Sequence, residues 1–225
     1  MILCMAEVLT AAELGELCQH LERQELVDGA ASAGWHARLV KRNQQLGPGP
    51  ETRRLQALVD KALARNPLFA IACRPHRIRP ALFSSYGPGM AYGTHVDDAV
   101  MGGAGATPPL RSDVSFTLFL SEPEGYDGGE LVVETSAGEQ AFKLEAGGLV
   151  LYPSSTLHRV APVTRGRRLA AVSWVQSQVR DPAQREILFD LDTARRALFE
   201  REGKSREFDL LSKSLANLLR MWAEV

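Results

Sequence analysis

Apolar side chains recur at intervals of three and four residues in two stretches of the N-terminal part, which is the period of an amphipathic helix. The first stretch starts at Thr10-Ala-Ala-Glu13, a capping-box pattern that predicts a helix over about residues 11–25. The second follows the loop GPGPETRR and keeps helical spacing until Asn66-Pro67 is expected to stop it. The apolar positions of this second helix are Leu55, Leu58, Val59, Ala62 and Leu63.

From about residue 77 the pattern changes to short runs rich in β-branched and aromatic residues. Turn-forming segments such as GPG, YDGG, SAGE and TRG separate the runs. This spacing is typical of an antiparallel sandwich or barrel, so we expect an α+β fold. The predicted strands are IRPALFSSY, DVSFTLFL, GELVVET, EQAFKL, GGLVLYP and RLAAVSWVQS.

After Gln178 the pattern becomes helical again. Asp181-Pro182 is an N-cap and first-turn pair, and a second apolar stripe runs from Phe208 to Trp222. We expect a helical pair packed on the barrel, with a homodimer contact through these helices as the alternative. The segment 99–112 is rich in Gly and Pro and long for a loop, so it is the candidate for a lid and for substrate contact.

Composition narrows the class of protein. The chain has 225 residues, 45% hydrophobic and 24% charged, with a formal net charge of -1, so no global charge attracts nucleic acid. The three cysteines lack a CxxC pattern and favour free thiols in a reducing cytoplasm. The N-terminus has no basic region and reaches Glu7 early, so we expect no signal peptide and no membrane span.

The chain has only five histidines, and two of them fit a metal site with a carboxylate. His95 and Asp97 stand at i and i+2, which places both side chains on one face of an extended strand. His158, after a later strand and turn, is the natural third ligand. Two imidazoles and one carboxylate leave three positions of an octahedron open, which suits Fe(II) and oxygen chemistry. Zinc would tolerate the same ligands in a hydrolase.

An arginine ten residues after His158 strengthens the iron interpretation. A strand that starts at Arg168 points its guanidinium to the same side as Val172 and Trp174, and an inward arginine requires an anion. A dicarboxylic cosubstrate would supply that anion to a bidentate guanidinium. We expect Arg165 and Arg167 to be solvated, Trp174 to belong to the core, and Asp98 to face away from Asp97.

These motifs resemble those of a known family. HxD, a later His and an Arg ten residues on, in a barrel of short strands, resemble the Fe(II)/2-oxoglutarate dioxygenases of the prolyl 4-hydroxylase type. The segment GGLVLYPSSTLHRVAPVTRGRRLAAVSWVQS is similar to the bacterial PKHD-type hydroxylases, and the segments YGPGMAYGTHVDDAV and LVKRNQQL and the helical tail extend the resemblance to nearly the whole chain.

The resemblance implies one Fe(II) per chain, held by His95, Asp97 and His158, with ascorbate as a possible reductant. It implies that Arg168 binds the distal carboxylate of 2-oxoglutarate and that Tyr86 hydrogen-bonds the same cosubstrate, a role for which Tyr92 competes. The implied fold is a double-stranded β-helix, or jelly roll. We expect a dioxygenase domain over residues 1–178, with its core at about 77–178, and a helical extension over 179–225.

The implied reaction is hydroxylation of an unidentified substrate, a peptidyl residue or a small molecule, with O2 consumed and succinate and CO2 released. Two alternatives use the same iron core. A nucleic-acid demethylase usually carries a second Arg six residues after the cosubstrate Arg, where this chain has Trp174. A non-enzymatic iron or 2-oxoglutarate sensor fits these residues equally well, and succinate release would distinguish it from an oxygenase. A zinc hydrolase would leave Arg168 without a role.

Overall fold

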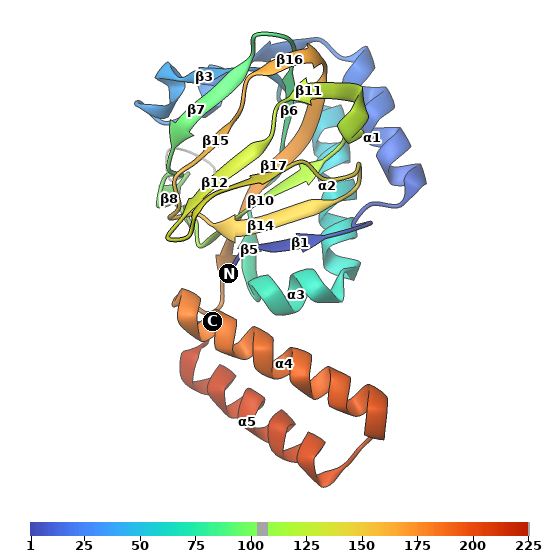
Figure 1. Ribbon diagram of the computed structural model, residues 1–225, viewed down its shortest axis with the longest axis vertical. Helices are drawn as coiled ribbons and strands as arrows, with labels where there is room; N and C mark the ends of the chain where they lie inside the picture. The colour runs from blue at the N-terminus through green and yellow to red at the C-terminus, as the bar shows by residue number, and fades with distance from the viewer. Residues whose placement is uncertain (103–107, 225) are drawn as a thin grey trace.

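Two antiparallel sheets form the centre of the computed structural model, which describes residues 1–102 and 108–224 (Figure 1). The larger, 8-stranded sheet has the order β1 (Leu3–Met5), β14 (Leu149–Pro153), β10 (Val114–Phe119), β17 (Arg168–Ser177), β6 (Leu82–Tyr86), β4 (Gln44–Leu46) and β2 (Leu26–Asp28), with β5 (Pro75–Ile78) paired to the end of β17. The 5-stranded sheet has the order β13 (Gly138–Phe142), β12 (Leu131–Thr135), β15 (His158–Val160), β7 (Ala91–His95) and β3 (Lys41–Arg42).

Two short ladders complete the strands of the described residues: β11 (Tyr126–Gly128) with β16 (Val163–Gly166), and β8 (Val100–Met101) with β9 (Leu110–Arg111). The two main sheets pack on each other through a small apolar cluster. Phe119 and Val150 come to it from the larger sheet, and Leu131 and Val133 from the smaller one. The space between the sheets is therefore partly filled by side chains, and the remainder is available for a site.

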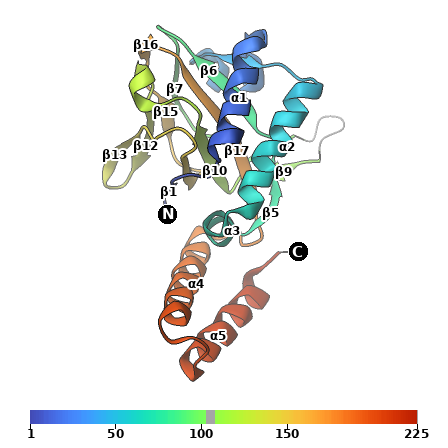
Figure 2. The ribbon, with the colours of Figure 1, turned by 90° about the vertical axis from the view of Figure 1, so that its right-hand side faces the viewer.

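Helices α1 (Ala11–Arg23) and α2 (Pro50–Arg65) cover the outer face of the larger sheet, and α3 (Pro67–Cys73) follows directly (Figure 2). The main apolar core lies between these helices and the sheet, where Leu17, Leu55 and Phe116 are at most 1% exposed. The predicted capping box is present, because the Thr10 hydroxyl accepts a hydrogen bond from the Glu13 amide and the Glu13 carboxylate accepts one from the Thr10 amide. Short 3-10 turns occupy η1 (Gly29–Ser32), η2 (Ala37–Leu39) and η3 (Pro123–Gly125).

The C-terminal residues form a hairpin of helices α4 (Pro182–Glu202) and α5 (Arg206–Trp222) that extends away from the sheets (Figure 1). Both predicted helices are present, with the Asp181 side chain capping α4. The hairpin is tied to the rest of the fold by an ion pair of 3.7 Å between Arg74 and Asp192. The chain after α5 returns to the end of β17, because the Glu224 amide donates to the Gln178 carbonyl at 2.7 Å.

Three expectations from the sequence need correction. The sheets do not begin near residue 77, because β1 to β4 in the N-terminal part join both of them. These strands have only 2 or 3 residues each, too few for an alternating pattern. Asn66-Pro67 ends α2 but also starts α3, where the Asn66 side chain accepts from the Phe69 amide at 3.0 Å. The predicted helix 11–25 ends at Arg23, because Gln24 is extended.

The segment 99–112 was expected to be an irregular loop and a lid. Its two described ends pair as β8 and β9, so they form a short ladder. Residues 103–107, on which the predicted lid centres, lie outside the described residues. None of the helices in the described ranges is both long and apolar enough to cross a membrane.

Candidate active site

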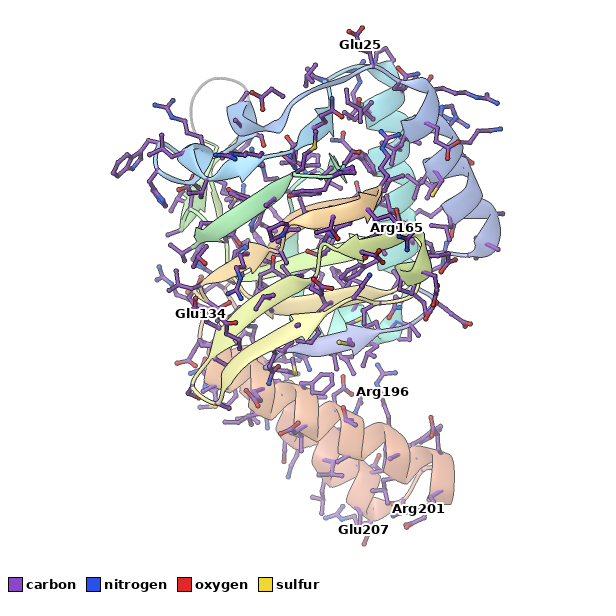
Figure 3. All side chains as sticks on the ribbon, turned by 45° about the horizontal axis from the view of Figure 1, so that its top comes forward. Glu25, Glu134, Arg165, Arg196, Arg201 and Glu207 are labelled. Atoms are coloured by element: carbon purple, nitrogen blue, oxygen red, sulfur yellow. The ribbon has the colours of Figure 1, made fainter. Side chains whose placement is uncertain are left out.

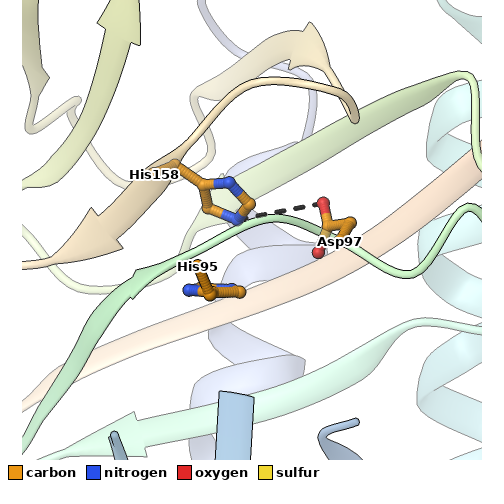
Figure 4. Close-up of side chains that lie close together, drawn as sticks. All are labelled: His95, Asp97 and His158. Carbon is orange, nitrogen blue, oxygen red and sulfur yellow. Dashed lines mark ion pairs between the residues drawn. The ribbon is translucent and has the colours of Figure 1, made fainter. Parts of the chain in front are cut away.

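The three predicted metal ligands meet on the smaller sheet (Figure 4). His95 ends β7 and pairs with His158, the first residue of β15, across the two strands. Asp97 follows β7 in an irregular segment rather than in the strand, so its convergence depends on the turn of the chain and not on strand parity alone. One ligand atom from each residue lies within 4.8 Å of the other two, and His158 Nε2 is 3.8 Å from Asp97 Oδ2.

Backbone carbonyls orient both imidazole rings. His95 Nδ1 lies 2.9 Å from the Gly93 carbonyl oxygen, and His158 Nδ1 lies 3.1 Å from that of Thr156. A carbonyl oxygen can only accept, so each Nδ1 is the donor of its contact and each Nε2 points away from the backbone, available to a metal. Burial, followed by the neighbouring His158 ring, lowers the pKa of His95 to about 3. The ring is therefore neutral at physiological pH, as a metal ligand must be.

Asp97 is held by a serine from the larger sheet. The Ser115 hydroxyl donates to Asp97 Oδ2 at 2.6 Å, and it lies 2.8 Å from the Ser154 hydroxyl. The Asp97 side chain is only 6% exposed, and its other oxygen, Oδ1, accepts no hydrogen bond from the described residues. Such outer partners of a ligand carboxylate set its orientation.

Arg168 opens β17 at the inner end of the same cavity, which has a volume of about 420 Å³. The side chain is 1% exposed, and its Nε, Nη1 and Nη2 have no hydrogen-bond partner among the described residues. Aromatic rings surround it, with the guanidinium carbon 5.2 Å from the Tyr86 ring centroid and 5.4 Å from that of Phe119. A buried cation with three unpaired donor atoms requires an anion.

A glycine makes room for this side chain. Gly129 has a φ of 69°, and a Cβ atom built on it would lie 3.0 Å from Arg168 Cδ and 3.1 Å from Tyr126 Cε2. The left-handed backbone and the tight contact together explain the second glycine of the YDGG turn. The glycine therefore keeps the Arg168 side chain in place.

The two neighbouring arginines lie outside the cavity, as expected. Arg165 is exposed and pairs with Asp127, with Nε 2.7 Å from Oδ2 (Figure 3). Arg167 is also exposed, and its Nε donates to the Ser85 hydroxyl at 2.7 Å. Only Arg168 of these three lines the cavity.

The two candidate tyrosines occupy different places. Tyr86 is 3% exposed, faces Arg168 across β6 and β17, and has its pKa raised by burial to about 12. Tyr92 stacks on His95, with 3.6 Å between ring centroids. Tyr86 therefore lies beside the Arg168 guanidinium, and Tyr92 lies beside the predicted metal ligand His95.

Trp174 and Asp98 both line the cavity. Trp174 was predicted to belong to the core, but it is partly exposed and lines the cavity. Trp174 is six residues after Arg168 in β17, so both side chains lie on the same face of the strand, toward the cavity. Asp98 was predicted to face away from Asp97; it is exposed, it also lines the cavity, and its carboxylate accepts no hydrogen bond among the described residues.

Sequence reasoning missed several residues at this site. Ser115, Lys41 and Gln45 come from strands that were either read only as apolar core or not predicted at all. Tyr126 is fully buried beside Arg168, and its hydroxyl has no partner among the described residues. The one available signal was the polar residues within the short segment KRNQQL, which is an unusual composition for a buried strand.

Known protein families match both parts of this chain. Residues 81–176 match the 2OG-Fe(II) oxygenase superfamily, and residues 182–224 match the PKHD-type hydroxylase C-terminal domain. A PKHD-type hydroxylase of Synechococcus sp. strain JA-2-3B'a(2-13) is 57% identical over 226 residues, covering 100% of both chains. The chain belongs to the PKHD-type hydroxylases. A PKHD-type hydroxylase of Acaryochloris marina is similarly close, at 58% identity over 225 residues and 100% of both chains.

Solved structures share the fold of this hydroxylase at low sequence identity. A prolyl-4-hydroxylase from Pseudomonas putida aligns with a TM-score of 0.54 and 22% identity, covering 78% of this chain and 92% of its own. The viral collagen prolyl hydroxylase of Paramecium bursaria Chlorella virus-1 aligns with a TM-score of 0.52 and 17% identity, covering 78% and 95%. The α+β architecture with antiparallel sheets is therefore that of the superfamily.

Membership in this family gives the reaction type. The protein is an Fe(II)- and 2-oxoglutarate-dependent hydroxylase, and 2-oxoglutarate and O2 are its cosubstrates. The family prediction made from the sequence motifs is confirmed.

Proposed function

We propose that His95, Asp97 and His158 hold the iron of this hydroxylase. The residues fit the metal, because both imidazoles turn Nδ1 to a backbone carbonyl and leave Nε2 available, and Asp97 Oδ1 has no hydrogen bond among the described residues. Fe(II) in oxygenases takes such a set of two nitrogen ligands and one oxygen ligand, with the remaining positions left for cosubstrates. The convergence of the three ligand atoms within 4.8 Å, in the same cavity as an unpaired arginine, is the observation that carries this proposal.

We also propose that Arg168 binds the distal carboxylate of 2-oxoglutarate. The guanidinium is buried in the cavity without a hydrogen-bond partner among the described residues, and its planar fork matches a carboxylate with two parallel hydrogen bonds. Tyr86, next to Arg168, is the tyrosine suited to hydrogen-bond the same cosubstrate. When bound, iron and 2-oxoglutarate supply the oxidising chemistry, and the protein supplies their orientation and a cavity that excludes bulk water.

Each residue then has a defined task. The two histidines and Asp97 fix the metal, Ser115 fixes Asp97, and Arg168 fixes the end of the cosubstrate that is far from the metal. Aromatic and aliphatic side chains such as Tyr152 and Leu131 line the wall between them and keep water away. Trp174 lines the cavity and is partly exposed, so beside it a peptidyl residue or a small molecule can present the C–H bond that is hydroxylated.

The proposal has an architectural part. We infer that the two sheets form a double-stranded β-helix and that residues 1–178 make up the dioxygenase domain, with residues 179–225 as a helical extension. A homodimer through that extension and a cytoplasmic location belong to the same proposal. The amphipathic α5 helix supports the first, and the free thiols of Cys4, Cys18 and Cys73 support the second.

The test compares two adjacent carboxylates. Asp97→Ala removes the anionic ligand and should abolish tight Fe(II) binding in an anaerobic titration, whereas Asp98→Ala should keep it. Wild-type protein with Fe(II), ascorbate and 2-oxoglutarate should release succinate, and Asp97→Ala should not. Wild-type iron affinity in Asp97→Ala would contradict the assignment of the metal site, and an iron-loaded wild type that binds 2-oxoglutarate without releasing succinate would favour a sensor.

A further inference from the structure

Lys41 is a buried cation that none of the roles described so far uses. It lies in β3, is 8% exposed and lines the cavity. Its Nζ donates one hydrogen bond, to the Ser32 hydroxyl at 2.8 Å, and no carboxylate lies within 4.0 Å of it among the described residues. An ammonium group has three donor hydrogens, so two remain to be satisfied from the cavity.

The position of Lys41 separates it from the cosubstrate end of the cavity. β3 pairs with β7, where Lys41 faces Tyr92, and its Nζ lies 5.0 Å from the Tyr92 ring centroid. The same tyrosine ring stacks on His95. Lys41 therefore stands one aromatic ring away from a proposed iron ligand, whereas Arg168 contacts a different pair of rings, Tyr86 and Phe119.

The charges of the cavity point in the same direction. Three cationic side chains line it, Lys41, Arg79 and Arg168, together with two carboxylates, Asp97 and Asp98. Once Asp97 binds the metal and Arg168 binds the cosubstrate, the exposed Asp98 is the one remaining carboxylate of the lining. Lys41 and Arg79 then leave the outer cavity with an excess of positive charge that favours an anionic ligand.

The segment around Lys41 turns its polar side chains inward. Lys41, Asn43 and Gln45 alternate along the chain, and each is at most 8% exposed. Gln45 donates to the Ser84 hydroxyl at 3.2 Å, whereas the Asn43 amide has no partner among the described residues. Burying polar groups in a strand costs stability, so such a pattern indicates selection for a site rather than for packing.

We propose that Lys41 is a specificity-determining residue that binds an oxyanion group of the primary substrate, such as a carboxylate. This inference rests on the proposed function, because it takes the metal and cosubstrate positions from it. The substrate class is then a molecule that carries an anionic group a few bonds from the hydroxylated carbon. Tyr92 contacts both Lys41 and His95, so it sets the spacing between that anionic group and the metal.

The test uses acetate as the probe and Mn(II) in place of iron. Wild-type protein loaded with Mn(II) and 2-oxoglutarate should bind acetate saturably, and the Mn(II)-dependent relaxation of the acetate methyl protons reports binding near the metal. Acetamide, which has the same shape without the charge, should show no such effect. Lys41→Met should weaken acetate binding about tenfold or more, since it removes one partner of a desolvated charge pair. Lys61→Met, at an exposed position of α2, is the matched control.

Two further measurements keep the outcome unambiguous. The affinities for Mn(II) and 2-oxoglutarate are determined on the same samples. If the proposed function is wrong, the wild type itself will fail to bind Mn(II) or 2-oxoglutarate. Ser32→Ala removes the one acceptor that the ammonium has among the described residues, and this variant should bind acetate at least as tightly as the wild type. The inference is overturned if Lys41→Met binds acetate like the wild type, as acetate bound to Mn(II) itself would. It is equally overturned if wild type binds no acetate, or if Lys41→Met loses 2-oxoglutarate affinity in parallel.

Discussion

Replacing Arg168 by methionine should change two properties in opposite directions. Methionine has a similar length and no charge, so Arg168→Met removes the proposed partner of the 2-oxoglutarate carboxylate and keeps the cavity filled. Losing one partner of a buried, hydrogen-bonded charge pair costs about 2–5 kcal/mol. At about 1.4 kcal/mol for each factor of ten, 2-oxoglutarate affinity should fall about 30-fold to several thousand-fold.

The same substitution should stabilise the protein when no cosubstrate is bound. In that state the guanidinium is 1% exposed, has three unpaired nitrogens and is surrounded by aromatic rings, so its charge is poorly compensated. Replacing buried charged groups by apolar ones is often stabilising by about 1–4 kcal/mol. For a chain of 225 residues this corresponds to a rise in Tm of roughly 2–4 °C for each kcal/mol.

Both properties can be measured on one set of variants. Anaerobic titration of Fe(II)-loaded protein gives the 2-oxoglutarate affinity, and calorimetry of the metal-free protein gives Tm. Arg167→Met is the matched control, because Arg167 is exposed and hydrogen-bonds Ser85 outside the cavity. Arg168→Lys should restore only part of the affinity, since a point charge cannot make the bidentate contact. A large affinity loss in Arg167→Met with normal binding in Arg168→Met would refute the assignment, and a lower Tm in Arg168→Met would refute the reasoning on charge.

Three other expectations follow from contacts described above. Ser115→Ala should weaken iron binding about 10- to 100-fold, because it removes the hydrogen bond that orients the Asp97 carboxylate. Competition with a chelator measures the iron affinity, and an unchanged affinity would show that the hydrogen bond is dispensable. Gly129→Ala should lower 2-oxoglutarate affinity with iron affinity kept, because the new Cβ meets the side chain of Arg168 at 3.0 Å; equal 2-oxoglutarate affinity would mean that the turn adapts. The pKa of Glu13 is lowered from 4.5 to about 2, chiefly by the hydrogen bond from Arg65. The contribution of this carboxylate to stability is therefore present above pH 4.5 and is lost as pH falls toward 2. In Glu13→Gln the free energy of unfolding should therefore depend less on pH between 4.5 and about 2 than in the wild type. An unchanged pH dependence in that range would contradict this.

Local patterns in the sequence predicted much of this molecule. Helices α1 and α5 have apolar stripes at helical spacing, and the strands of the large sheet have β-branched runs bounded by turns, so both follow from side-chain periodicity. Arg168 could be distinguished from Arg167 because consecutive residues of a strand point to opposite faces, so only one of the two side chains can point inward. The spacing of His95 and Asp97 is local as well, although the turn after β7 and not strand geometry brings the two together.

The missed residues share one property, which is that their roles depend on partners far away in the sequence. Ser115 meets Asp97 only because β10 and the end of β7 face each other across the cavity, and nothing near Ser115 in the sequence announces this. Lys41 lies in a strand of 2 residues that exists only because β7 is beside it. Short strands of this kind are fixed by tertiary pairing, so neither periodicity nor propensity reveals them.

The path of the C-terminal extension has a practical consequence. The extension leaves the sheet at Val179 and comes back to it at Ala223, where the two residues form a β-bridge. Arg111 of β9 then reaches Glu224, with Nη1 2.8 Å from Oε2. The extension is thus a loop closed at its base, and its entry and exit points are neighbours. A reporter fused to the end of this chain would sit beside β9, next to the segment that borders the cavity. A reporter inserted at the turn around Gly203, at the far tip of the hairpin in Figure 1, would leave that region undisturbed.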